Sequence, residues 1–321
     1  MGQTQAMIHV VAAALIDGRG RVLLQQRHAD SHQGSLWEFP GGKLEADEPV
    51  ADGLARELRE ELDIEIGRHR PLIRVRHAYT DRAVLLDVHV VEQWQGDPRG
   101  REGQPLAWVE SEMLREYPMP AADEPVVTAL QLPSKYLITP PQITDAGRFL
   151  RGLGASLAAG IRLVQLRLFD LTESELRRVG REACRLCHAS GARVLLNGSP
   201  ETAAAIDADG LHLNSLTLHA HDTRPVAEAQ LLAASCHSLR DLTQAGRLGA
   251  DFALLSPVLP TRSHPDAEPL GWERFADWVD ASGMPVFALG GMNPGLLETA
   301  WEHGAQGIAG IRGLWADEQL G

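Results

Sequence analysis

Residues 41–64 read GGKLEADEPVADGLARELREELDI, a glycine turn followed by an acidic segment with helical periodicity. Glu57, Glu60 and Glu61 are spaced i, i+3 and i+4, so on a helix they share one face and repel each other unless a cation lies between them. The opposite face is apolar and is expected to pack inward; it comprises Val50, Ala51, Leu54, Ala55, Leu58 and Leu62. Carboxylates that converge beside a Gly-Gly turn predict an oxygen-rich site for Mg²⁺ or Mn²⁺, the ions that bridge phosphates.

From Gly42 onward this stretch resembles the Nudix box, because it matches the Gly, Glu, Arg-Glu and Glu-Glu positions of that motif. The Nudix family has Gly at the position of Asp63, just past the predicted helix end, where the backbone is commonly left-handed. Asp is one of the few residues that tolerates this conformation, so we expect the local fold to be kept. A solvated acidic helix would explain the charge, but it would not predict this spacing.

The whole chain has 321 residues and a net charge of −13, with 44% hydrophobic residues. This length is sufficient for two domains with cores of their own. The acidic charge argues against direct binding to nucleic acid, which requires a basic surface. No apolar run approaches membrane-spanning length, and no basic stretch precedes an apolar one at the start. We therefore expect no membrane segment and a cytoplasmic location.

The order of apolar runs predicts two α/β domains. Strand patterns at Val10–Ile16, Val22–Gln26 and Ala83–Glu92 surround the acidic helix, which predicts a mixed sheet flanked by helices. Four prolines between Pro118 and Pro133 precede a new pattern, so we place the boundary near Leu132, with domains at 1–132 and 133–321.

The second domain repeats a short apolar run followed by a helical stretch. Eight such units predict a closed (β/α)₈ TIM barrel, with an open doubly wound sheet as the alternative. The apolar runs begin at Tyr136, Ile161, Arg193, Gly210, Leu231, Asp251, Pro285 and Gly307. Cys184 and Cys187 lie in one helical stretch, and two buried thiols are a simpler interpretation than a zinc pair.

Beyond the box, residues 5 to 130 resemble the MutT type of 8-oxo-dGTP diphosphatase within the Nudix family, which implies an α/β/α sandwich. The segments that carry the resemblance are LLQQRHADSHQGSLWEFPGGKLE, QWQGDPRGREGQPLAWV and PAADEPV. The resemblance implies that Glu57 acts as base or metal ligand, that Glu60 and Glu61 bind metal, and that Gly41 offers its carbonyl. It also implies a metal-site carboxylate at Glu102 and an orienting role for Arg56. Water would attack the β-phosphorus and release a nucleoside monophosphate and diphosphate.

The same resemblance implies a nucleotide pocket, whose residues would be Arg27, His32, Glu38, Phe39 and Tyr79. Phe39 and Tyr79 would stack on a base, and Arg27 would meet the ribose or α-phosphate. Phe39 could equally be a core residue, and Arg27 and His32 could be surface side chains. Asp123 stands where the MutT type has an Asn that reads the base edge. An ionised Asp only accepts hydrogen bonds, whereas a protonated one also donates, so preference for 8-oxoguanine is an open question.

Residues 135 to 315 resemble thiamine phosphate synthase and its TenI relatives, through LVQLRLFDLTESEL, ADGLHLN, SCHSLRDL, GADFALLSPVLPT and VFALGGMNP. The resemblance implies a phosphate site at the loops after the last two strands, formed by Gly290, Gly291, Arg312 and Gly313. Phe169 and Gly198 replace a lysine and an aspartate of the synthase. We therefore expect a degenerate phosphate-ligand-binding barrel or a packing partner. His237, which follows the fifth strand pattern, could line a pocket, but a lone His at a strand end is more often structural.

The leading hypothesis is a Mg²⁺-dependent nucleoside triphosphate pyrophosphohydrolase that converts 8-oxo-dGTP to 8-oxo-dGMP and diphosphate. Such an enzyme would serve nucleotide-pool sanitation and DNA repair. Two alternatives remain open. The chain could be a bifunctional protein of thiamine metabolism that cleaves thiamine-related pyrophosphates, or the barrel could bind a small phosphorylated ligand and regulate the hydrolase.

Overall fold

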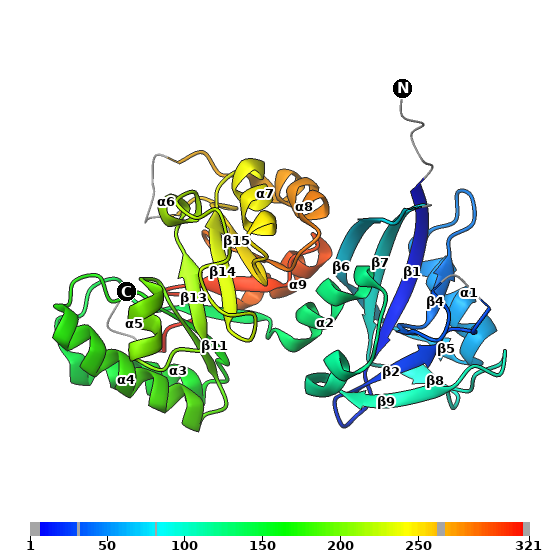
Figure 1. Cartoon of the computed structure of the whole chain (residues 1–321), viewed down its shortest axis with the longest axis horizontal. Helices are drawn as coiled ribbons and strands as arrows, with labels where there is room; N and C mark the ends of the chain where they lie inside the picture. The colour runs from blue at the N-terminus through cyan, green and yellow to red at the C-terminus, as the bar shows by residue number, and fades with distance from the viewer. Residues whose placement is uncertain (1–6, 31–32, 81, 262–266, 317–321) are drawn as a thin grey trace. The chain divides into compact units, whose positions relative to one another are not determined.

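The structure is a computed structural model, and it describes residues 7–30, 33–80, 82–261 and 267–316 (Figure 1). The chain divides into two compact units, Met1–Gln131 and Leu132–Gly321. Among the residues that the structure describes, none belongs to a helix long and apolar enough to cross a membrane.

The N-terminal unit contains a mixed four-stranded sheet in the order β4-β1-β7-β6, and a three-stranded antiparallel sheet in the order β3-β2-β9. In the first sheet, β1 runs parallel to β7 and antiparallel to β4, and β6 runs antiparallel to β7. The strands are β1 (Met7–Leu15), β2 (Arg21–Gln26), β3 (Trp37–Glu38), β4 (Gly41–Lys43), β6 (His69–Ala78), β7 (Ala83–Val91) and β9 (Leu106–Glu110). A short pair, β5 (Glu65–Ile66) with β8 (Trp94–Gln95), lies outside both sheets. The predicted mixed sheet is confirmed.

Helices cover both faces of the four-stranded sheet (Figure 1). The side chains of β1 alternate, so Val11 and Leu15 pack against Leu58 of α1 (Val50–Leu62), while Ala12 joins a second cluster with Val126 of α2 (Glu124–Gln131). Two 3₁₀ helices, η1 (Ser111–Glu116) and η2 (Ala121–Asp123), precede α2. The predicted inward face of α1 is correct for Leu54, Leu58 and Leu62. It is wrong for Ala51, which is exposed because it lies off the buried stripe.

The C-terminal unit is a closed barrel of eight parallel strands, in which β17 pairs with β10. Each predicted run overlaps one strand, so the TIM barrel is confirmed and the open sheet is wrong. The strands are β10 (Lys135–Ile138), β11 (Leu163–Leu166), β12 (Arg193–Leu196), β13 (Gly210–Leu213), β14 (Leu231–Cys236), β15 (Phe252–Leu255), β16 (Val286–Ala288) and β17 (Gly307–Gly310).

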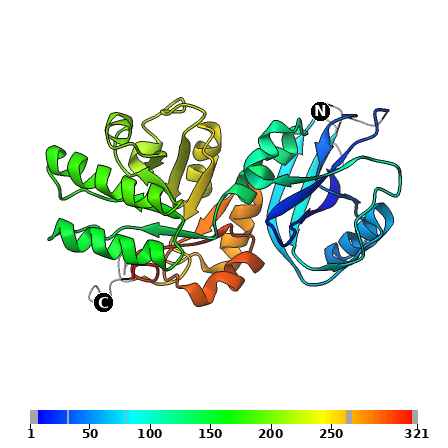
Figure 2. The same cartoon turned by 90° about the horizontal axis from the view of Figure 1, so that it is seen from below.

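Helices surround the outside of the barrel (Figures 1 and 2). They are α3 (Ala146–Ala158), α4 (Glu173–Ala189), α5 (Pro200–Ala205), α6 (Ser215–Leu218), α7 (Leu239–Arg247), α8 (Gly271–Ser282), η3 (Pro294–Leu296) and α9 (Leu297–Glu302). Cys184 and Cys187 on α4 are buried, and burial raises the pKa of each thiol to about 12. The predicted buried thiols are therefore confirmed.

The interior of the barrel is filled by large side chains, among them Tyr136, Phe252 and Phe287. Leu132, which follows the last residue of α2 directly, belongs to this interior cluster. Its carbonyl also accepts a hydrogen bond of 3.0 Å from Nε2 of Gln306. The barrel core therefore begins one residue after the N-terminal unit ends.

Candidate active site

The acidic helix α1 ends at Leu62, and Asp63 after it adopts a left-handed conformation with φ 61° and ψ 37°. Asp63 therefore adopts the left-handed conformation that was expected to be tolerated there. Its backbone N–H closes the helix end by donating to the carbonyl of Arg59 at 3.2 Å. The glycine turn lies against the helix. A Cβ on Gly42 would be 2.3 Å from Oε2 of Glu57, so any other residue there would require that carboxylate to move from its place.

Arg56 holds the carboxylates of the box together. Its Nε and Nη2 donate to the two oxygens of Glu48, each at 2.8 Å, and its Nη1 donates to Oε1 of Glu57 at 2.8 Å. The same Nη1 lies 3.5 Å from Oε2 of Glu60. The hydrogen bonds from Arg56 hold the pKa of Glu48 at about 2. Glu48 received no role from the sequence, although its place as the first glutamate of the box was a usable signal.

Glu61 lies in a different environment from the other two box glutamates. Its Oε2 accepts from Nε2 of Gln25 at 2.9 Å and from the N–H of Gly41 at 3.1 Å. Burial raises the pKa of Glu61 to about 7, and the negative charges of Glu38 and Glu57 add to the effect. The side chain of Glu60, by contrast, is 63% exposed.

The donor set of this region consists of carboxylate oxygens and the Gly41 carbonyl, which are the hard ligands that Mg²⁺ and Mn²⁺ prefer. A cation would also favour the ionised form of Glu61, whose pKa is raised mainly by burial and further by the charges of Glu38 and Glu57. The donor types therefore suit a divalent ion, which Glu57, Glu60 and Glu61 would hold with their carboxylates drawn closer together than they lie in the structure. In the described part of the chain, no three Asp, Glu, His or Cys side chains are gathered closely enough to form an ion cage.

The loop that carries Glu102 is fixed to the end of α1 by its backbone. The N–H groups of Arg99 and Arg101 donate to the carbonyls of Leu62 and Glu61, each at 3.0 Å. The carboxylate of Glu102 is 65% exposed and lies 3.7 Å from Nε2 of His28. The structure thus brings the loop beside the box glutamates, while the Glu102 carboxylate itself points to solvent.

A cavity of about 140 Å³ adjoins the glycine turn. It brings together five of the six predicted nucleotide-binding residues; His32 lies outside the described residues. The cavity is lined by Ile8, Val10, Ala12, Arg27, Gln33, Glu38, Phe39, Gly41, Lys43, Tyr79, Arg82, Val84, Leu86, Pro120, Ala122 and Asp123. Gln33, Lys43 and Arg82 were not identified from the sequence, because nothing in their local pattern separates them from ordinary surface residues.

The charges in this cavity are arranged around Arg27, whose Nη1 is bonded to Glu38. Asp123 is 5% exposed, and burial, with the charge of Glu38, raises its pKa to about 8. Burial also raises the pKa of Glu38, against the pull of Arg27. Phe39 is 3% exposed and belongs to an apolar cluster, so it is both a core residue and a cavity wall.

In the barrel, the predicted phosphate loops lie close to their neighbours. A Cβ on Gly290 would be 2.9 Å from Cα of Pro257, and a Cβ on Gly313 would be 2.5 Å from the carbonyl oxygen of Met292. Gly290 and Gly291 both have positive φ, so glycine is needed there for conformation as well as for space. Arg312 is exposed at the same loops, and its phosphate role stays a prediction.

A polar chain in the barrel interior was missed from the sequence. Tyr136 Oη lies 3.2 Å from Nδ1 of His212, whose Nε2 lies 2.7 Å from Oγ of Ser235. Burial, with the charge of Arg167, lowers the pKa of His212 to about 3, so the ring is neutral. The alternation of side chains along a strand places His212 on the face opposite to its two leucine neighbours on β13, but it does not show which face is the barrel interior.

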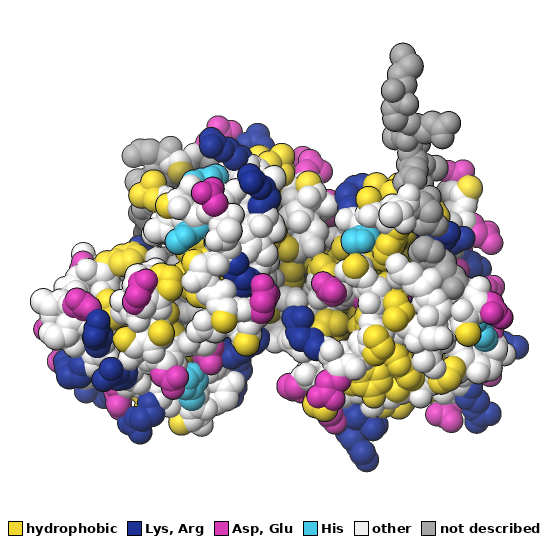
Figure 3. Space-filling view, in the orientation of Figure 1, with side chains coloured by type: hydrophobic (Ala, Val, Ile, Leu, Met, Phe, Trp, Pro, Cys, Tyr) yellow, Lys and Arg dark blue, Asp and Glu magenta, His cyan; other side chains and the backbone are white. Residues whose placement is uncertain are grey.

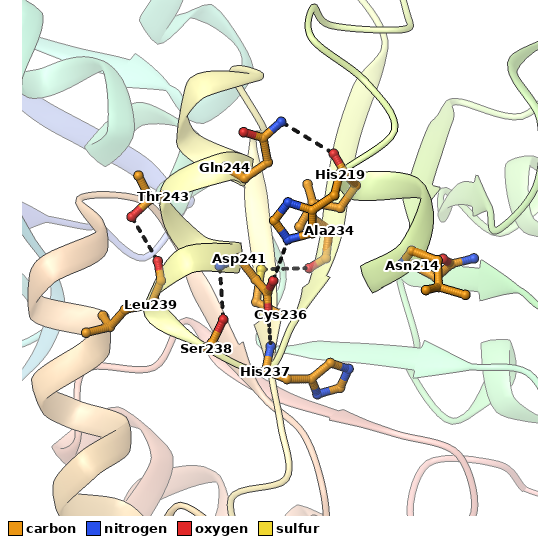
Figure 4. A network of polar contacts seen from close by, with 12 residues as sticks. Asn214, His219, Ala234, Cys236, His237, Ser238, Leu239, Asp241, Thr243 and Gln244 are labelled. Carbon is orange, nitrogen blue, oxygen red and sulfur yellow. Dashed lines mark hydrogen bonds and ion pairs between the residues drawn. The ribbon is translucent and has the colours of Figure 1, made fainter.

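Around His237, Asp241 organises a second polar network (Figure 4). Asp241 Oδ2 accepts from the N–H of His237 at 2.9 Å, and Oδ1 lies 2.7 Å from Nε2 of His219. Nδ1 of His237 is 2.9 Å from the carbonyl of Ser256. These contacts fix the loop after β14, which agrees with the structural role expected for His237.

Charged side chains are dispersed over the face shown in Figure 3, where Lys and Arg are interspersed with Asp and Glu and do not gather into one basic area. This face gives no support to nucleic-acid binding.

Comparison with known proteins assigns the two units separately. Residues 135–314 match the family model described as thiamine monophosphate synthase, and residues 11–129 match that of the NUDIX domain. The CTP pyrophosphohydrolase of Escherichia coli is 41% identical over 123 residues, which cover 38% of this chain and 90% of that protein. The putative thiamine-phosphate synthase 2 of Aquifex aeolicus is 35% identical over 182 residues, 57% of this chain and 97% of that protein. The structure of thiamine phosphate pyrophosphorylase from Pyrococcus furiosus aligns with a TM-score of 0.50 at 25% identity, over 58% of this chain and 89% of that one.

Proposed function

We propose that the N-terminal unit hydrolyses nucleoside triphosphates to a nucleoside monophosphate and diphosphate. The chain belongs to the Nudix family through residues 11–129 and to the thiamine monophosphate synthase family through residues 135–314. The observation that carries this proposal is the continuity of one cavity from Asp123 and Phe39 to Gly41 and Lys43, beside the box helix. A base at one end places its polyphosphate toward the carboxylates at the other.

The chemistry assigned to each residue follows from its contacts. A bound divalent ion supplies charge neutralisation for the polyphosphate and acidifies the attacking water. Glu57 accepts the proton of that water, and Arg56 holds the Glu57 carboxylate in position by its 2.8 Å hydrogen bond. Gly42 leaves the space that the Glu57 carboxylate occupies. Mg²⁺ is the ion we propose, with Mn²⁺ as its substitute.

The base is selected by the buried end of the cavity. The pKa of Asp123, about 8 because of burial, keeps this carboxyl neutral near pH 7. A neutral carboxyl donates through its O–H and accepts through its carbonyl, as an amide does. This arrangement supports a base with adjacent donor and acceptor groups, and 8-oxo-dGTP remains a candidate substrate.

CTP is the second nucleotide candidate, and the 41% identity to a CTP pyrophosphohydrolase favours it. The neutral Asp123 carboxyl can donate to cytosine N3 and accept from the exocyclic amine. The deciding experiment compares kcat/KM for 8-oxo-dGTP, dGTP, CTP and dCTP with Mg²⁺, detecting monophosphate and diphosphate. A ratio near one between 8-oxo-dGTP and dGTP would argue against a role in nucleotide sanitation, and absence of turnover for all four would reject the proposal.

A function in thiamine metabolism is favoured by the barrel. The Nudix site would then cleave thiamine-related pyrophosphates, and the barrel would bind a small phosphorylated ligand at Gly290, Gly291, Arg312 and Gly313. Phe169 is 54% exposed at the position where the synthase carries a lysine. The barrel therefore lacks one of the cations that would neutralise a departing pyrophosphate. Adding thiamine diphosphate to the substrate panel tests the first part. Calorimetry with thiazole phosphate and thiamine phosphate tests the second, and no heat of binding would reject it.

A further inference from the structure

Two buried glutamines lie between the box helix and the loop of Glu102. Gln25 on β2 is 4% exposed, and Gln104, just before β9, is 8% exposed. A buried carboxamide is costly unless its donors and acceptor are bonded, so a pair of them in contact indicates a defined network. Neither residue belongs to the Nudix box.

Gln25 contacts two glutamates from different parts of the site. Its Nε2 donates to Oε2 of Glu61 at 2.9 Å. It also lies opposite Glu38 in the β2–β3 pair, and its side chain favours the ionised form of the Glu38 carboxylate. One carboxamide therefore joins the base cavity, through Glu38, to the helix that would hold the cation.

Gln104 continues this network to the loop. Its Nε2 donates to Oε1 of Gln25 at 3.4 Å and to the carbonyl of Glu61 at 3.3 Å. Its Oε1 accepts from the N–H of Glu102 at 2.9 Å. The loop lies close to this residue: a Cβ on Gly100 would be 2.2 Å from the carbonyl oxygen of Gln104 and 3.0 Å from its Oε1.

The direction of both amides is determined by one backbone group. The N–H of Glu102 can only donate, so Oε1 of Gln104 must face it. Nε2 of Gln104 then faces Gln25, which must present its own Oε1. Nε2 of Gln25 is thereby directed at Glu61. Reversing either amide would set like groups against each other at several of these contacts.

We propose that Gln25 and Gln104 form an amide relay that positions the Glu61 carboxylate for the divalent cation, holds the backbone of the Glu102 loop beside it and links both to the base cavity through Glu38. Both are positioning residues, because neither is expected to touch the cation or the reacting phosphate. The proposal deepens the function proposed above and rests on it. Without the relay, the box helix and the Glu102 loop would still be joined by backbone hydrogen bonds, but the carboxylate of Glu61 would lose its side-chain donor.

The test replaces each glutamine by methionine, which has a similar length and forms no comparable hydrogen bonds. Gln25→Met and Gln104→Met are compared with Gln26→Met, a neighbour on β2 whose Nε2 donates instead to the carbonyl of Ser35. Mn²⁺ binding to the full-length protein is measured by electron paramagnetic resonance without nucleotide, together with kcat, KM and thermal unfolding. We expect Mn²⁺ affinity to fall about 10- to 100-fold in both relay variants and to stay at the wild-type value in the control.

The relay predicts two further outcomes. Of the two glutamines, only Gln25 lies beside Glu38, so Gln25→Met should change KM for the nucleotide as well as kcat, whereas Gln104→Met should change kcat alone. The double variant should bind Mn²⁺ no more weakly than the weaker single variant, because both members act as one unit. Independent, additive losses would contradict a relay.

The results distinguish a failure of the relay from a failure of the proposed function. If the wild type binds Mn²⁺ but hydrolyses no nucleoside triphosphate, the proposed function fails and the binding data still judge the relay. Wild-type Mn²⁺ affinity in both relay variants, or an equal loss in Gln26→Met, would overturn the relay alone. Should Gln25→Met unfold, Gln25→Asn keeps an amide in the core but is one methylene too short to span Glu61 and Gln104, and it should show the same loss.

Discussion

The guanidinium of Arg56 donates two hydrogen bonds of 2.8 Å to the carboxylate of Glu48, eight residues before it in the chain. This fork-to-fork geometry is available to arginine and not to lysine, whose ammonium is a single point charge. Because the remaining Nη1 of Arg56 bonds Glu57 at 2.8 Å, the position of Glu57 depends on the Glu48 pair.

Replacing Arg56 by Lys should therefore lower kcat on the order of 10²-fold, because a shift of about 1 Å in a reacting group can cost that much. Steady-state kinetics with the best substrate of the panel measures the effect. Arg59→Lys is the matched control, since Arg59 pairs with Glu65 on the exposed side of α1. A kcat for Arg56→Lys equal to that of the control would show that Glu57 is positioned independently of Arg56.

The Glu57→Gln variant should lose about 10²- to 10⁴-fold in kcat, the range that a positioned general base contributes. Glutamine keeps the shape that fits beside Gly42 but cannot accept a proton, so circular dichroism and thermal unfolding should remain near wild type. Glu112→Gln, on the exposed surface of η1, controls for loss of one negative charge. Near-normal turnover by Glu57→Gln would show that another carboxylate acts as the general base.

Asp123→Asn should change how stability depends on pH. The folded protein holds the Asp123 proton up to about pH 8, whereas the unfolded chain releases it near 3.8. The wild type should therefore lose unfolding free energy relative to the Asn variant as pH rises from 4 to 8. Urea unfolding of both proteins at pH 5, 7 and 9 measures this difference, and a constant difference across the three would indicate that Asp123 is ionised throughout.

Removing the barrel should leave hydrolysis intact if the two units are independent. A chain that ends at Gln131 retains all of α2, and it omits Leu132, which belongs to the barrel core. We expect the 1–131 fragment to unfold cooperatively and to keep the kcat/KM of the full chain. A fragment that folds but turns over slowly would instead indicate that the barrel supports the hydrolase site.

The sequence predicted the elements whose pattern is local. The box helix, the strands β1, β2 and β7, and the eight barrel strands all carry continuous apolar periodicity. Strand β6 was missed because arginines and histidines alternate with its apolar residues, and because Pro71 lies at a register shift in its pairing with β7. Ala51 was placed inside because a small residue gives little information about which face of a helix it occupies.

In the site, the residues predicted from the sequence were those that belong to known motifs. The contacts that support these residues were not predicted. Gln25 and Gln104 are 79 residues apart, and a polar residue gives no sign in a sequence that it will be buried. Their contact depends on β2 and β9 pairing in one register. The raised pKa of Asp123 likewise results from burial by distant segments. The roles predicted for the box glutamates, for the nucleotide-cavity residues, for Glu102 and for the barrel glycines all remain predictions.

The buried position of Leu132, immediately after the last residue of α2, bears on how the protein can be cleaved. A protease needs several residues of extended, accessible chain in its own active site, and the junction between Gln131 and Leu132 offers a helix end on one side and a core leucine on the other. Limited digestion should therefore begin in surface loops within a unit before it releases the two units intact.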